Sequence, residues 1–190
     1  MQTSCKLSSV AKNYLNTFHC TLDGMIQDMT EAELNNSISY NYIAQMVPHH
    51  QAAIEMSQNL LQYTTFIPLQ DIACGIIAEQ TKSIETMQEI QCACGMRKNC
   101  SQDLCLYQRR VDQIMQHMFS SMSSTPDTNQ INANFIREMV PHHMGAIEMS
   151  KTTLQYDICP QLKPVLDAII SSQQKGICQM RRLLHQPGCM

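Results

Sequence analysis

The chain has 190 residues, which is enough for one compact domain or two small ones. Its 13 Lys and Arg against 16 Asp and Glu give a formal charge of −3, which argues against a nucleic-acid surface, because such a surface needs concentrated positive charge. No apolar stretch approaches the roughly 20 residues that a membrane-spanning helix needs, and the N-terminal residues of the chain as given contain no secretory signal. We therefore expect a cytoplasmic protein whose cysteines are mostly reduced.

Apolar residues recur with a helical period, and no segment alternates with a period of two for long enough to predict a strand. In chain order, the expected helices lie at residues 7–29, 37–62, 68–93, 102–123, 130–155 and 161–185. Pro68 and Pro160 fall at or just before helix starts, where a missing N–H does no harm. Pro48 and Pro141 fall inside predicted helices, at a cost of about 3 kcal/mol each. Each marks either a helix N-terminus or a kink that aims the histidines that follow it.

The second and fifth predicted helices are copies of each other. A shift of 93 residues aligns Asn41–Tyr63 with Asn134–Tyr156, with 15 identities in 23 positions. The sequence Met-Val-Pro-His-His stands at the centre of both copies, at residues 46–50 and 139–143. Weaker matches extend into the flanking helices, so the internal repeat covers a three-helix unit.

These observations predict an all-α fold, a helical bundle of about six helices built from two three-helix repeats. The first repeat covers residues 1–94 and the second residues 102–190, with a Cys-rich linker at 95–101. We expect the two repeats to pack as one compact bundle.

Methionine, cysteine and histidine, which bind soft or borderline metal ions, number 15, 10 and 7 in this chain. On an ideal helix the two histidines of each pair straddle the preceding methionine on the apolar face, whereas Glu55 and Glu148 point to solvent. Buried histidine pairs need hydrogen-bond partners or a metal ion, although they can also be ordinary core residues, as can the methionines. The candidate metal ligands are Met46, His49, His50, Met56 and Met87 in the first repeat, and Met139, His142, His143, Met149 and Met180 in the second.

Two glutamines lie on the apolar faces of the helices that follow the histidine helices. Gln80 and Gln173 are expected either to accept hydrogen bonds from the imidazoles, and so orient them, or to cap a backbone group. Thioethers together with imidazoles favour Cu(I), and the expected lack of inward carboxylates disfavours Mg²⁺, Ca²⁺ and Mn²⁺. Because neither repeat contains Glu-x-x-His, di-iron chemistry is a weaker alternative.

The paired Met-Val-Pro-His-His segments, each followed by a helix with the pattern Gln-x-x-x-Ile-x-x-Met, resemble the ferritin-like family known as domain of unknown function 305. The resemblance extends over about residues 38–185. It implies an all-α fold with a four-helix-bundle core and a link to copper resistance, with copper bound through Met and His. The family motif falls on Met46, His49, His50, Met56, Met139, His142, His143 and Met149.

Four cysteines lie close together around the linker, and their spacing is looser than that of tight zinc sites. A thiol site for Cu(I), a local disulfide and crosslinks to other chains all remain open for Cys92, Cys94, Cys100 and Cys105. Scattered cysteines would suit a protein linked covalently into a spore or envelope layer; they are Cys5, Cys20, Cys74, Cys159, Cys178 and Cys189.

The sequence thus predicts a metal-binding protein that sequesters or buffers copper as Cu(I). We see no arrangement of nucleophile and base, and therefore expect no enzymatic turnover. The expected partner is a metal ion, with no nucleic acid and no membrane span, while a homo-oligomer or a disulfide-linked assembly stays open. The alternatives are a Cys-crosslinked structural protein and a ferritin-like di-iron oxidoreductase.

Overall fold

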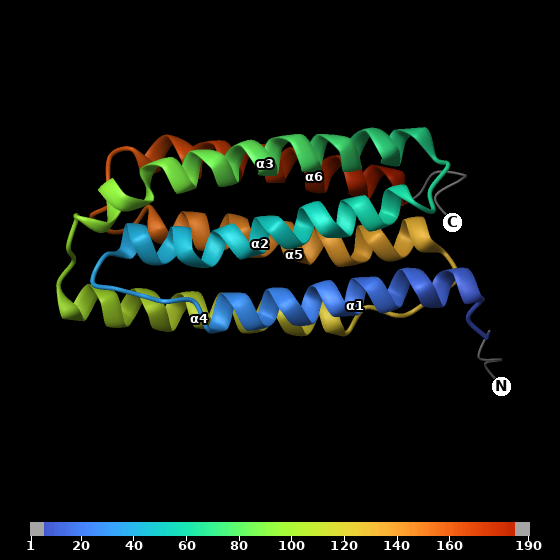
Figure 1. Cartoon of the computed structure of the whole chain (residues 1–190), viewed down its shortest axis with the longest axis horizontal. Coiled ribbons are helices and arrows are strands. Elements are labelled where there is room, and N and C mark those ends of the chain that lie inside the picture. Colours follow the sequence, from blue (N-terminus) through green and yellow to red (C-terminus); the bar gives the residue numbers. More distant parts are fainter. Residues whose placement is uncertain (1–5, 185–190) are drawn as a thin grey trace.

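The computed structural model describes residues 6–184 as a bundle of helices (Figure 1). The helices are α1 (Ser9–Thr30), α2 (Ile38–Leu61), α3 (Ile67–Gly95), α4 (Ser101–Ser123), α5 (Ile131–Thr153) and α6 (Leu162–Leu183). The predicted all-α bundle of six helices is confirmed, and each helix boundary lies within two residues of its predicted position. No helix in residues 6–184 is long and apolar enough to cross a membrane.

The helices form three layers, with α2 and α5 in the middle (Figure 1). Helices α3 and α6 pack against each other and against one side of this middle layer, while α1 and α4 cover the opposite side. Helix α2 therefore buries 16 of its 24 residues, whereas α1 in an outer layer buries only 7 of 22. The histidine pairs lie in the most enclosed layer of the fold.

Local sequence explains where the helices begin. Ser8 and Ser37 are N-caps whose side-chain oxygens accept hydrogen bonds from backbone N–H groups in the first turns of α1 and α2. Pro48 and Pro141 lie inside α2 and α5, so the interpretation of either as a helix N-terminus is wrong. Packing on several sides of the middle layer offsets the hydrogen bond that each proline removes.

Candidate metal centre

Two histidines, one from each copy of the motif, meet where α2 and α5 cross. The imidazole rings of His49 and His142 have centroids 3.7 Å apart and an interplanar angle of 31°. Nε2 of His49 lies 3.2 Å from the backbone oxygen of His142, and Nε2 of His142 lies 3.1 Å from the backbone oxygen of His49. Both side chains are fully buried. The pair is reciprocal, so each ring is fixed by the backbone that carries the other.

These hydrogen bonds determine which nitrogen of each ring carries a lone pair. Because a carbonyl oxygen can only accept, Nε2 of His49 and of His142 must each carry the proton. Nδ1 is then the unprotonated nitrogen, and in both rings it is buried without a hydrogen-bond partner among the described residues. Burial, and next the neighbouring His142, lower the pKa of His49 well below its usual value, and burial lowers the pKa of His142 to about 4. Both imidazoles are neutral at physiological pH, and the lone pair of each Nδ1 is free to bind a metal ion.

The second histidine of each pair faces the layer formed by α3 and α6. His50 lines one hollow between these helices, with a volume of about 430 Å³, and His143 lines another of about 450 Å³. Burial lowers the pKa of His50 to about 3 and that of His143 well below its usual value. Their Nδ1 atoms also lack partners within the described part of the chain. All four imidazoles of the motif are therefore neutral, buried and incompletely hydrogen-bonded.

Gln80 and Gln173 line both hollows and are buried beside the histidines. The hydrogen bonds that we expected between these side-chain oxygens and the imidazole N–H groups are not formed, because neither Oε1 has a partner among residues 6–184. The same observation leaves no backbone group capped by either oxygen. The structure thus places the amides near the imidazoles and leaves their oxygens free to accept.

The six predicted methionine ligands divide into two groups. Met46 and Met139 are fully buried one helical turn before the histidines of their own helix, so their side chains are neighbours of the imidazoles. The other four also lie in the core, but each is six or seven residues, or about 9–10 Å of helix rise, from the nearest motif histidine or glutamine of its own helix. These four are Met56, Met87, Met149 and Met180.

One further methionine lies against the motif of α5, and the sequence did not single it out as a ligand. A Cβ built on Gly145 would overlap Sδ of Met118, so this thioether packs directly over the glycine, one turn after His142. The available signal was the repeat itself, since Gly145 aligns with Ala52 in the first copy. The missing methyl group makes room for the sulfur atom.

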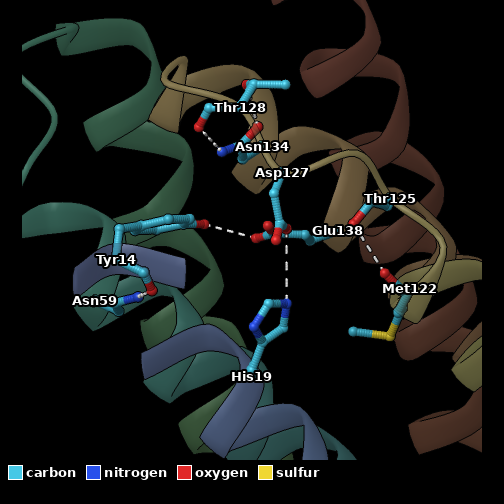
Figure 2. A network of polar contacts seen from close by, with 9 residues as sticks. All are labelled: Tyr14, His19, Asn59, Met122, Thr125, Asp127, Thr128, Asn134 and Glu138. Atoms are coloured by element: carbon cyan, nitrogen blue, oxygen red, sulfur yellow. Dashed lines mark hydrogen bonds and ion pairs between the residues drawn. The ribbon is translucent and has the colours of Figure 1, made fainter. Parts of the chain in front are cut away.

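The expectation that no carboxylate points inward is wrong for Glu138. Its side chain is only 2% exposed, and its Oε2 accepts a hydrogen bond of 2.7 Å from the hydroxyl of Tyr14 (Figure 2). Burial is the main cause that raises the pKa of Glu138 to about 8, and the charge of nearby Asp127 raises it further. The carboxyl group is therefore mostly protonated at neutral pH. In the described residues, no group of three or more His, Cys, Asp or Glu side chains is placed to hold a metal ion.

The four cysteines of the predicted thiol cluster differ in their exposure to solvent. Cys94 is buried, whereas Cys92, Cys100 and Cys105 are exposed. All eight cysteines of the described range carry free thiols, and Cys5 and Cys189 lie outside that range.

Comparisons with known proteins agree with this architecture. A family model described as "Domain of unknown function (DUF305)" matches residues 14–91 and 39–184. CopM in an Ag-bound form obtained by soaking has a TM-score of 0.56 and 26% identity, over 76% of this chain and 92% of CopM. CopM in the Cu(II)-bound form has a TM-score of 0.54 and 26% identity, over 76% and 93%. A DUF305 fragment from Deinococcus radiodurans shares the fold, with a TM-score of 0.57 and 20% identity over 77% of this chain and 95% of the fragment. No curated protein matches the chain.

Proposed function

Because the chain belongs to the family of domain of unknown function DUF305, we propose that it binds copper, as Cu(I), through the imidazoles and thioethers of α2 and α5, and that it sequesters or buffers this ion. The observation that carries the proposal is the set of four buried, neutral imidazoles whose Nδ1 atoms have no hydrogen-bond partner in the described part of the chain. A buried acceptor without a partner costs about 1–3 kcal/mol, and a metal ion would supply the missing partner.

The chemistry of the donors supports a soft ion. Metal binding to histidine requires the neutral ring, and burial already keeps these rings neutral, so few protons have to be released on binding. Imidazole suits copper and several other ions, whereas thioethers favour Cu(I). Crystal forms of the structurally similar CopM hold Ag or Cu(II), which supports copper as the ion.

The residues present fit such an ion in two positions along one path. His49 and His142, with Met46 and Met139, would hold the ion in the middle layer. The hollows between α3 and α6 reach His50 and His143, so these residues would receive the ion from solvent. When bound, the ion would be a positive charge to which the lone pairs of the Nδ1 atoms could bind. The oxygens of Gln80 and Gln173 could then orient the imidazoles from the hollow side.

Anaerobic titration with Cu(I) against a chromophoric competitor, on protein with blocked thiols, tests this proposal. We expect saturable binding with a Kd below about 1 µM. Replacing His50 and His143 by alanine should weaken binding at least tenfold, whereas the matched control that replaces the exposed His19 and His117 should leave it unchanged. Equal affinity in all three proteins would overturn the proposal.

A second variant, which carries both Met46→Leu and Met139→Leu, tests the thioethers without a large change in packing. Both substitutions conserve volume and should cost little stability. If the thioethers are ligands, this protein should keep its helicity, measured by circular dichroism, and lose Cu(I) affinity. Undiminished Cu(I) affinity would remove the thioethers from the site.

A second candidate function is supported by a different feature. The exposed free thiols would allow crosslinks to other chains, as expected for a structural component of an assembly; in the described residues they are Cys20, Cys74, Cys92, Cys100, Cys105 and Cys178. Electrophoresis of the oxidised protein without reductant separates this function from copper binding, since it predicts covalent multimers.

A further inference from the structure

The buried cysteine of the sequence cluster has a partner from the other half of the chain. Cys94 lies in the last turn of α3, and Cys159 lies in the connection that leads into α6. Both meet the start of α2. The hydroxyl of Ser37 donates a hydrogen bond of 2.9 Å to the backbone oxygen of Cys94, and the backbone N–H of Cys159 donates one of 2.8 Å to Oγ of Ser39. Two serines of a single helical turn thus hold the backbones of both cysteines.

Exposed contacts hold the same two segments together nearby. Arg97, just after the end of α3, forms an ion pair with Asp157, just before Cys159. The side-chain amide of Asn99 donates a hydrogen bond of 2.7 Å to the backbone oxygen of Asp157. The exposed contacts of Arg97 and Asn99, together with those of the buried serines, therefore fix the end of α3 relative to the connection before α6.

The two thiols share a hydrogen bond and are nearly inaccessible. Cys94 is 0% exposed and Cys159 is 6% exposed, whereas the other described cysteines are exposed to solvent. Burial, and then the hydrogen bond with the thiol of Cys159, raise the pKa of Cys94 to about 12. Both observations distinguish this pair from Cys92, which is only two residues away.

We propose that Cys94 and Cys159 are a modification site that closes into a reversible intramolecular disulfide by exchange with a small-molecule disulfide. A disulfide requires two cysteines whose backbones are close and whose sulfur atoms can meet. Two serines of one helical turn hold the backbones of this pair, and the two thiols share a hydrogen bond. The bond would join the first half of the chain to the second at one end of the bundle. The inference is independent of the proposed copper site, which lies at the centre of the bundle.

The exchange balances in two steps. The thiol of Cys159, the more accessible of the two, loses its proton, and its thiolate attacks one sulfur of the small disulfide. The S–S bond breaks, a mixed disulfide forms on Cys159, and the departing thiolate takes up a proton to leave as the first thiol. Cys94 then loses its proton and attacks the sulfur of Cys159, which releases the second thiol in the same way. The protein loses two electrons, and the small disulfide gains them.

The high pKa of Cys94 makes the second step slow while the helix end stays closed. The same enclosure protects the finished bond from reduction. Exposed cysteines, by contrast, would give mixed disulfides or crosslinks between chains.

Peptide mapping of the whole protein after incubation with oxidised and reduced glutathione tests this inference. After acid quenching, alkylation and digestion with trypsin, Cys94 lies in the peptide 83–97 together with Cys92. Cys159 is the only cysteine of the peptide 152–175, because Pro164 protects the bond after Lys163. We expect these two peptides to be linked to each other, and the link to disappear on reduction.

Two variants identify the cysteine responsible. Cys92→Ser is the matched control in the same peptide and should keep the link, whereas Cys94→Ser should lower its yield at least tenfold. A link that survives in Cys94→Ser, or one that is lost in Cys92→Ser, would overturn the assignment. So would the absence of any link once the exposed thiols are fully oxidised.

The rate at which a reagent alkylates each thiol of the wild-type protein tests the same inference without any variant. Under native conditions, an alkylating reagent should modify Cys94 at least tenfold more slowly than Cys92, since Cys94 is buried and Cys92 is exposed. Equal rates would mean that Cys94 is open to solvent, and the enclosed pair would not exist.

Discussion

Replacing Glu138 by glutamine should remove a pH dependence of stability that the buried carboxyl group creates. Burial raises the pKa of Glu138 from its usual 4.5 to about 8 in the folded protein. At neutral pH the folded state therefore holds a proton that the unfolded chain has released. The contribution of this group to the free energy of unfolding must then fall as the pH rises from 4.5 through about 8. Glutamine does not titrate, and its side-chain oxygen can still accept the hydrogen bond of Tyr14.

The useful pH window is set by the histidines. Burial lowers the pKa of the four motif histidines, so below their usual value of 6.5 the unfolded chain binds protons that the folded state does not. That effect destabilises the protein towards acid and would mask the carboxyl group. Between about pH 6.5 and 7.5 the protons of the four unfolded-state histidines still offset the Glu138 proton, so the effect of Glu138 has to be read from the difference between variant and wild type, and one proton corresponds to about 1.4 kcal/mol per pH unit. Allowing for partial ionisation near pH 8, the contribution of Glu138 to wild-type stability should fall by about 1 kcal/mol across this window.

Urea unfolding at several pH values within the window, followed by circular dichroism, measures this slope. The difference in free energy of unfolding between Glu138→Gln and the wild type cancels groups that titrate alike in both, and it should grow by about 1 kcal/mol in favour of the variant. Glu55→Gln, which removes an exposed carboxyl group, is the control and should keep the wild-type slope. Parallel slopes for the wild type and Glu138→Gln would refute the reasoning.

Three glycine substitutions test the packing around the candidate site. Gly145→Ala should destabilise the protein by about 1–3 kcal/mol, because the new Cβ would overlap Sδ of Met118. Gly24→Ala, with nothing within 4 Å of its added Cβ, should stabilise it by about 1 kcal/mol, and urea unfolding compares the two. Gly176→Ala would place a Cβ 3.2 Å from Nε2 of His143 and so displace the ring. Cu(I) titration should then show at least a threefold loss of affinity at unchanged helicity, and unchanged affinity would separate that ring from the site.

The helices were predictable because their signal is local. Apolar periodicity and prolines at helix starts depend only on neighbouring positions, so they located all six helices to within two residues. Proline inside a helix is different, since its local cost is offset by packing that a sequence does not display. Pro48 could therefore be interpreted in two ways until the middle layer was visible.

Burial of the histidine pairs followed from the face they share with Met46 and Met139, but their pairing did not. The shift of 93 residues shows that His49 and His142 are equivalent, and the same shift makes His50 equivalent to His143. When two equivalent helices cross, only one equivalent pair can meet at the crossing. The side-chain packing between α2 and α5 selects that pair, and no local pattern encodes it.

Glu138 was missed for a related reason. A helical wheel assigns charged residues to solvent, but a helix in a middle layer has little solvent-facing surface. Gln45 occupies the aligned position of the first repeat and is also buried. An uncharged polar residue at the position that aligns with Glu138 was the one sign in the sequence that this position is not fully exposed. A buried position filled by glutamine in one copy tolerates glutamate in the other when the carboxyl group keeps its proton.

Differences between the copies therefore indicate where the two halves of the centre are not equivalent. His49 and His142 face each other through identical contacts. Around the outer histidines the symmetry is broken. Gly176 packs its backbone against the ring of His143, while its aligned residue Ser83 brings to the hollow of His50 a hydroxyl that has no partner among residues 6–184. An ion entering from solvent would meet a confined imidazole in one hollow and an imidazole beside a free hydroxyl in the other. In the proposed copper site, the two hollows would thus present the ion with different surroundings beside His50 and His143.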